Sequence, residues 1–196
     1  MNTRTHSAAV RAFASICAVL LLASPARAGF HLWQIRELFT NLDGTQQFIE
    51  LFTSVDNQQF TNGSQIQVTE QATSTTHTFT FPSNTSSPTS NHAILIATVG
   101  LASAGGPASN FTIPSGFLFA GASTITYVST VQGAVNYTSL PTDGNLSRVV
   151  PANTTQANSP QNYAGTVGHV PEPTTWGLIG LGGFGLCMLF RRRATA

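Results

Sequence analysis

Hydrophobic and polar residues alternate in short runs along the middle of this 196-residue chain, and turn-forming residues separate the runs. The runs QIQVTE (65–70), THTFTF (76–81) and STITYV (123–128) alternate with a period of two, which is typical of strands with one buried face. The run HAILIATV (92–99) is continuously apolar, as in a strand buried on both faces. No window shows helical periodicity over ten residues. The pattern therefore predicts a mainly β domain.

Two apolar runs open this domain on either side of a turn. HLWQIRELF (31–39) and QFIELFT (47–53) flank a segment with Asn41, Asp43 and Gly44, which favours a hairpin or tight loop. We expect an antiparallel β-sandwich of two sheets. The expected core residues are Trp33, Ile35, Phe48, Ile49, Leu51, Ile94 and Ile96.

The predicted domain covers residues 29–151, and LSRVV (146–150) is expected to be its last strand. Residues 152–169 are polar and contain Pro and Asn, so they are expected to form a linker that lifts the domain off a membrane.

The first residues predict a secretory signal helix. In residues 1–28, a positively charged start precedes a short apolar run at 12–23. Ala26 and Ala28 fit the small-x-small cleavage rule, so the mature chain is expected to begin at Gly29.

A second apolar run, residues 174–190, predicts a transmembrane helix. Its 17 residues span about 26 Å as a helix, against a hydrocarbon core of about 30 Å. Arg191, Arg192 and Arg193 begin the basic tail 191–196. Because a positive cluster stays in the cytoplasm, these arginines are expected to stop transfer and leave the domain outside.

The order of features in residues 170–196 is distinctive. Val170-Pro171-Glu172-Pro173 precedes a Gly-rich apolar span and then the arginines, and this arrangement resembles a PEP-CTERM sorting signal. The resemblance implies cleavage by an exosortase, a membrane-embedded cysteine transpeptidase of Gram-negative bacteria that make exopolysaccharide. It also implies transient anchoring in the inner membrane, followed by transfer to the cell surface or extracellular matrix. Proline fits here because it holds the backbone extended.

A second resemblance lies within the domain. Residues 35–38, 48–51 and 144–149 resemble the opening and closing elements of a lamin-tail-like domain, which is an immunoglobulin-like sandwich. The Leu-x-Gly-Trp segment of that family is missing after the second strand. This resemblance implies a fold and a binding or display role, without catalysis.

Composition excludes some partners and stabilising devices. Only 8% of the residues are charged, and there is no lysine. The domain has two arginines against six carboxylates, so it lacks the basic surface that nucleic acid requires. Cys17 and Cys187 both lie in the terminal apolar runs, so no disulfide is expected within the domain.

Glu37 and Glu50 are the main candidates for chemistry, because each lies within an apolar strand. Two facing carboxylates could hydrolyse a glycoside. Alternatively, each could pair with Arg36 or Arg148, or accept backbone N–H groups from a neighbouring loop.

No metal site or cofactor is expected. The histidines are spread along the chain without a zinc motif. A Ca²⁺ site at the Asp43 or Asp143 loop is an alternative, although neither loop matches an EF-hand.

We expect an exported, non-enzymatic surface or matrix protein that meets the secretion machinery and an exosortase. Residues 174–190 would hold it in the membrane before processing. Its hydroxyl- and amide-rich surface would suit exopolysaccharide. The alternative is an extracellular glycan-active hydrolase that uses Glu37 and Glu50.

Overall fold

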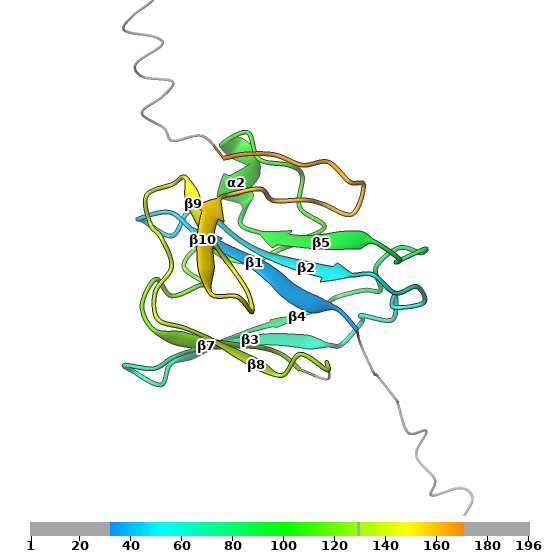
Figure 1. Cartoon of the computed structure of the whole chain (residues 1–196), viewed down its shortest axis with the longest axis horizontal. Helices are drawn as coiled ribbons and strands as arrows, with labels where there is room; N and C mark the ends of the chain where they lie inside the picture. Colours follow the sequence, from blue (N-terminus) through cyan, green and yellow to red (C-terminus); the bar gives the residue numbers. More distant parts are fainter. Residues whose placement is uncertain (1–31, 129, 171–196) are drawn as a thin grey trace, which may run out of the picture.

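The computed structural model describes residues 32–128 and 130–170, in which two β-sheets pack face to face (Figure 1). The six-stranded sheet has the order β10-β9-β1-β2-β5-β6, and the four-stranded sheet has the order β4-β3-β7-β8. The large sheet contains β1 (Gln34–Thr40), β2 (Gln47–Thr53), β5 (His92–Ala97), β6 (Phe111–Thr112), β9 (Leu146–Val149) and β10 (Thr154–Ala157). The small sheet contains β3 (Gln65–Glu70), β4 (Thr76–Thr80), β7 (Ser123–Tyr127) and β8 (Ala134–Tyr137).

The large sheet is mixed rather than wholly antiparallel. Most neighbouring strands run antiparallel, but β5 and β6 are parallel, with Ile96 beside Phe111. The chain reaches β6 from β5 through the short helix α2 (Val99–Ser103) and the loop after it. The expectation of two antiparallel sheets is therefore correct for the small sheet only.

The main core lies between the two sheets and follows the period-two pattern. The seven residues expected in the core are all buried, each with 0% exposure, but Phe48 belongs to a second apolar cluster on the other side of the large sheet. Ile66 and Val68 of β3 and Ile125 of β7 enter the same core from the small sheet. Their neighbours in sequence point to the opposite side, because successive strand residues face opposite ways. Strand β5 is buried on both faces, as its continuous apolar run predicts.

A β-bulge in β1 changes which residues reach the outer side of the large sheet. The register with β2 shifts between Ile35 and Glu37, so Arg36 and Glu37 both turn away from the core. The side-chain amide of Gln132 binds both backbone polar groups of Ile35, at the start of the bulge. It accepts from the Ile35 N–H at 2.6 Å and donates to the Ile35 carbonyl at 2.9 Å.

The expected linker over residues 152–169 is wrong. Residues 154–157 form β10, which pairs antiparallel with β9, so β9 is not the last strand. Residues 158–170, which we call the C-terminal strap, then cross the outer side of the large sheet and end at a fully buried Val170. These residues do not form a solvated linker because their polar groups, such as the N–H and hydroxyl of Ser159, bond to the sandwich.

Within the described residues, no helix has the length and apolar character needed to cross a membrane. The predicted signal helix and the predicted transmembrane helix both lie outside the described residues.

Candidate functional site

Glu37 of β1 and Glu50 of β2 lie directly opposite each other across the two strands. Both side chains are on the outer side of the large sheet, yet their exposure is only 2% and 0%. The strap covers them. A buried carboxylate needs hydrogen-bond donors or a cation, so its partners show what the pair does.

Glu50 is held by a cation and a backbone donor. Its Oε1 forms an ion pair with the Arg36 guanidinium, and its Oε2 accepts the Gln161 N–H at 2.6 Å. Burial raises the pKa of the Glu50 carboxyl, and the contacts with Arg36 and Gln161 offset that only in part. Arg36 also covers the Phe52 ring, 4.5 Å from its centroid.

Glu37 is held by hydroxyl, amide and backbone N–H donors. It accepts the N–H of Ser159 at 2.9 Å and the hydroxyl of the same residue at 3.0 Å. The Ser147 hydroxyl of β9 donates to it at 2.5 Å, and the Gln156 amide donates at 3.4 Å. Both carboxylates therefore bind backbone of the strap. The sequence left two roles open for each carboxylate. Glu50 pairs with Arg36, and Glu37 accepts a backbone N–H group from a neighbouring loop.

Asn158 fixes both ends of the strap. Its side-chain oxygen accepts the Val170 N–H at 2.8 Å, while its Nδ2 donates to the Asn145 carbonyl at 2.8 Å. Between these ends the strap folds back on itself, with a bridge between Gln161 and Val167. The strap is thus a closed loop seated on the sheet.

Apolar contacts also hold the strap against the large sheet. Val170 has 0% exposure and packs with residues of β1, β2, β5 and α2. Phe39 and Phe48 stack beside it at 5.3 Å between ring centroids. A Cβ at Gly168 would lie 2.6 Å from Cδ of Pro107, so only glycine allows this close approach. These contacts form a second apolar cluster, made of Phe39, Phe48, Leu95, Ala97, Leu101 and Val170.

The loop aspartates each close their own turn. Asp43 Oδ1 accepts from the Thr45 N–H at 3.0 Å and its hydroxyl at 2.7 Å, which lowers the pKa of Asp43. Asp143 Oδ1 accepts the N–H groups of Asn145 and Leu146 at 2.9 and 2.8 Å. In the part of the chain that the structure describes, no three His, Cys, Asp or Glu side chains gather as a metal site.

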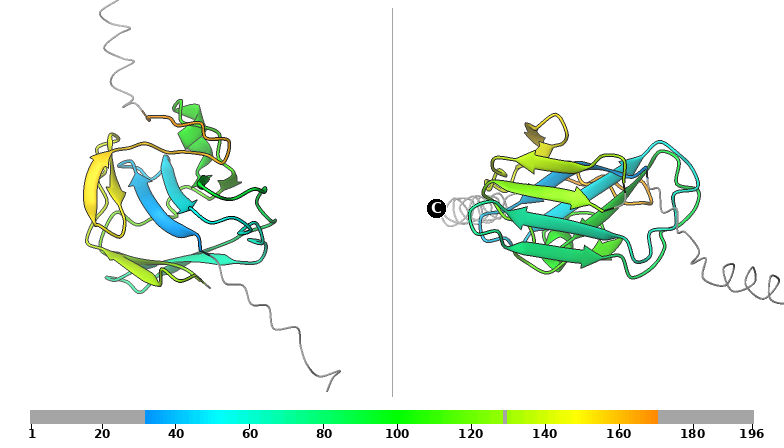
Figure 2. Two further views of the ribbon diagram at one scale, coloured as in Figure 1. Left: turned by 45° about the vertical axis from the view of Figure 1, so that its right-hand side comes forward. Right: turned by 90° about the horizontal axis from the view of Figure 1, so that it is seen from below.

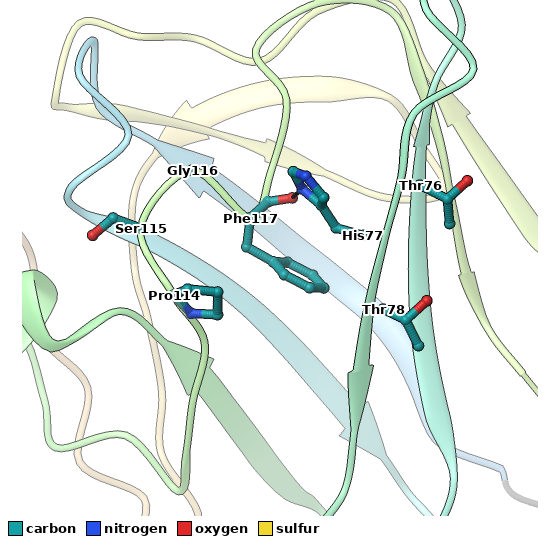
Figure 3. Close-up of a pocket in the computed structure, with 7 residues that line it drawn as sticks. All are labelled: Thr76, His77, Thr78, Pro114, Ser115, Gly116 and Phe117. Atoms are coloured by element: carbon teal, nitrogen blue, oxygen red, sulfur yellow. Dashed lines mark hydrogen bonds between the residues drawn. The ribbon is translucent and has the colours of Figure 1, made fainter.

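A hollow of about 310 Å³ lies between β4 and the loop 114–117 (Figure 3). Its walls are Thr76, His77 and Thr78 from the strand and Pro114, Ser115, Gly116 and Phe117 from the loop. His77 Nδ1 lies 2.9 Å from the Phe117 carbonyl oxygen, and its ring stacks on Phe119 at 4.5 Å. This volume is at the small end of the usual range for ligand pockets, about 300–1,000 Å³. Among the described residues, His77 is the one acid or base that lines this hollow.

No described segment crosses the outer side of the small sheet (Figure 2, right). We call this surface the polar face. Register and burial assign it Gln65, Gln67, Thr69, Thr76, Thr78, Thr80, Thr124, Thr126, Ala134 and Asn136. Apart from Ala134, every one of these side chains ends in a hydroxyl or an amide. The sequence indicates the polar composition of the domain but not its concentration on one surface.

Of the residues predicted to act in sorting, some lie within the described chain and others lie outside it. Val170 is described, and it is a buried part of the fold. Pro171, Glu172 and Pro173, the stop-transfer arginines 191–193 and the cleavage-site residues Ala26 and Ala28 lie outside the described residues.

Comparison with known protein families gives a match at the C-terminal end. Residues 169–193 match the PEP-CTERM protein-sorting motif. No curated protein and no solved structure matches the chain. The chain therefore carries a PEP-CTERM motif, which implies an exported protein that is sorted by an exosortase.

Proposed function

We propose that this protein is a non-catalytic module of the cell surface or extracellular matrix. It is exported, held briefly in the inner membrane, and released outward after an exosortase cleaves its tail. The sandwich then binds exopolysaccharide.

The observation that carries this proposal is the overlap between the sorting motif and the folded domain. The motif spans residues 169–193, and Val170 within it is fully buried. His169 lies beside it, with Nδ1 3.0 Å from the Asn158 carbonyl oxygen. The first two residues of the motif, His169 and Val170, thus belong to the folded domain, which supports the domain as the cargo that the signal delivers.

The same overlap limits how far the cargo could lie from a membrane that holds the apolar run. Only residues 171–173 separate Val170 from the apolar run that begins at residue 174. Four extended Cα–Cα steps span at most about 14 Å. While the apolar run is in the membrane, the sandwich therefore lies against the bilayer surface instead of being lifted away from it.

The carboxylate pair supports a non-catalytic role. A glycosidase needs one carboxyl to protonate the leaving oxygen and another to face the sugar or a water molecule. Here both carboxylates lie beneath the strap and accept hydrogen bonds from Ser159 and Gln161. A substrate could reach them only after the strap had left the sheet.

Exopolysaccharide is proposed as the ligand because of the surface chemistry. The domain offers hydroxyl and amide groups at high density and few charges. Such groups match the hydroxyls of a sugar polymer, and many weak hydrogen bonds along a polymer add up through multivalency.

The sorting step can be tested by fractionating cells that express the full chain with a C-terminal epitope tag. In an exosortase-positive host, the tag should be lost and the domain should appear outside. Glu172→Gln keeps the extended backbone and removes one charge, so we expect the unprocessed chain to accumulate in the inner membrane.

The matched control is Glu70→Gln, which removes one carboxylate from the domain and should leave processing unchanged. Replacement of Pro171, Glu172 and Pro173 together should abolish tag loss. Normal tag loss in that triple variant would contradict exosortase sorting and leave a plain membrane anchor.

A further inference from the structure

The side chains of the polar face lie in regular rows. Thr78 of β4, Gln67 of β3 and Thr126 of β7 lie in one row across the sheet, and Thr76, Thr69 and Thr124 form the next row. Neighbouring strands are about 4.8 Å apart, and alternate residues along a strand are about 6.7 Å apart. The result is a two-dimensional array of hydrogen-bonding groups at fixed spacing.

The charge of this surface restricts its ligand. No charged side chain belongs to the face as the described residues define it, and the domain carries two arginines against six carboxylates. Nucleic acid and anionic membranes need basic groups, so both are poor ligands. An anionic polymer would be repelled by the acidic domain. A typical protein partner would meet none of the aromatic, Met or Arg residues that anchor protein interfaces.

Several side chains of the face form hydrogen bonds with one another. Thr124 donates to the Asn136 side-chain oxygen at 2.6 Å, and the hydroxyls of Thr69 and Thr76 lie 2.8 Å apart. Each hydroxyl keeps further donor or acceptor capacity. Threonine is also stiff about χ1, so little rotamer freedom is lost on binding.

The face also points the right way for a displayed protein. The strap lies on the outer side of the large sheet, and the polar face lies on the outer side of the small sheet, across the sandwich (Figure 1). In Figure 3, the Thr76 and Thr78 side chains project away from His77 and Phe117, toward the open side of β4. A domain held at the strap end would therefore present this face away from its anchor.

We infer that the polar face is the ligand-binding surface of this protein, and that its ligand is an uncharged polysaccharide whose hydroxyl groups bond to the threonine and amide array. The inference rests on the proposed function for the choice of an extracellular polymer. It adds the surface, the neutral charge of the polymer and the residues in contact.

The test is co-sedimentation of the full-length chain, purified in mild detergent, with insoluble neutral polysaccharides. The probes are cellulose, curdlan and agarose, together with carboxymethyl cellulose as the charged counterpart. Thr78→Val and Thr126→Val, combined, remove two hydroxyls of one row while keeping β-branched side chains of the same shape. The control is Thr154→Val with Thr155→Val, which changes two exposed threonines of β10 in the other sheet.

We expect binding to at least one neutral polymer that persists in 1 M NaCl, with weaker binding to carboxymethyl cellulose. The double variant on the face should bind about tenfold or more weakly, as expected for two lost hydrogen bonds, and the β10 control should bind like the wild type. Thermal unfolding should show that both variants are folded.

Absence of binding to all three neutral polymers would overturn the inference, as would equal binding by the face variant and the wild type. The tag-loss assay separates this from the sorting proposal, because neither pair of substitutions touches residues 169–193. Normal tag loss without polysaccharide binding defeats the present inference and leaves the sorting proposal intact. Binding without tag loss defeats only the sorting proposal.

Discussion

Glu37 and Glu50 stand opposite each other in the β1–β2 register, and each accepts a backbone N–H from the same strap, donated by Ser159 and Gln161. We call these two buried carboxylates, Glu37 and Glu50, the clamp. They hold the chain that leads into the sorting motif, and they explain why an acidic pair lies within two otherwise apolar strands.

The clamp should contribute measurably to stability. Glu50→Ala leaves the Arg36 guanidinium and the Gln161 N–H without their shared acceptor, so we expect the free energy of unfolding to fall by about 2–3 kcal/mol. Urea denaturation of the full-length chain measures this. Glu70→Ala is the control, because that carboxylate accepts from the exposed Thr73 hydroxyl and forms no ion pair within the described residues, and it should change stability by about 0.5 kcal/mol or less. Equal effects of the two substitutions would argue against the clamp.

The raised pKa of Glu50 has a definite consequence for pH dependence. Between its ordinary value of 4.5 and the higher pKa in the folded state, the folded chain binds more protons than the unfolded chain. Stability contributed by this group is therefore fully present below pH 4.5 and is lost as pH rises through the folded pKa.

Glu50→Gln removes this titration, so the wild-type minus variant difference in unfolding free energy should decrease as pH rises from 4.5. Urea denaturation of both chains across this range measures the difference. A difference that grows with pH would show that the pKa is lowered instead.

Gly168 should be required for the strap to seat. Gly168→Ala places a methyl group against the Pro107 ring, so we expect faster amide exchange in residues 158–170, with less change in the sheets. Hydrogen exchange followed by mass spectrometry resolves the two regions. Gly121→Ala is the matched control, because a Cβ there meets only the end of the Glu70 side chain, at 4.0 Å. Unchanged exchange in the Gly168 variant would contradict the close packing of the strap.

The proposed non-catalytic role predicts that the purified chain releases no reducing sugar from neutral or charged polysaccharides. Reducing-end assays after prolonged incubation test this directly. Hydrolysis that disappeared in both Glu37→Gln and Glu50→Gln, with each variant still folded, would favour the hydrolase alternative.

The central strands could be predicted from sequence because their signals are local. The period-two runs and the continuous run at 92–99 identified β3, β4, β5 and β7, and the seven expected core residues are all buried. An apolar residue every second position specifies both the strand and its inward face.

The strap could not be predicted, because its contacts are distant in sequence and polar. Ser159 and Gln161 bond to carboxylates 122 and 111 residues away, and the stretch carries no hydrophobic period. A run of Asn, Gln, Ser and Pro predicts a solvated linker when read locally. In the folded chain, the side-chain oxygen of Asn158 accepts the Val170 N–H, a bond that backbone carbonyls supply in regular strands.

Intact-mass spectrometry of the exported protein tests the central claim most directly, with an exosortase-positive host compared against an isogenic host that lacks the enzyme. In the positive host we predict a chain that begins at Gly29 and ends at or after Val170 but before residue 174, because Val170 belongs to the folded domain. In the other host the apolar run and its arginines should remain. A chain that keeps residues 174–196 in both hosts would contradict exosortase sorting of this protein.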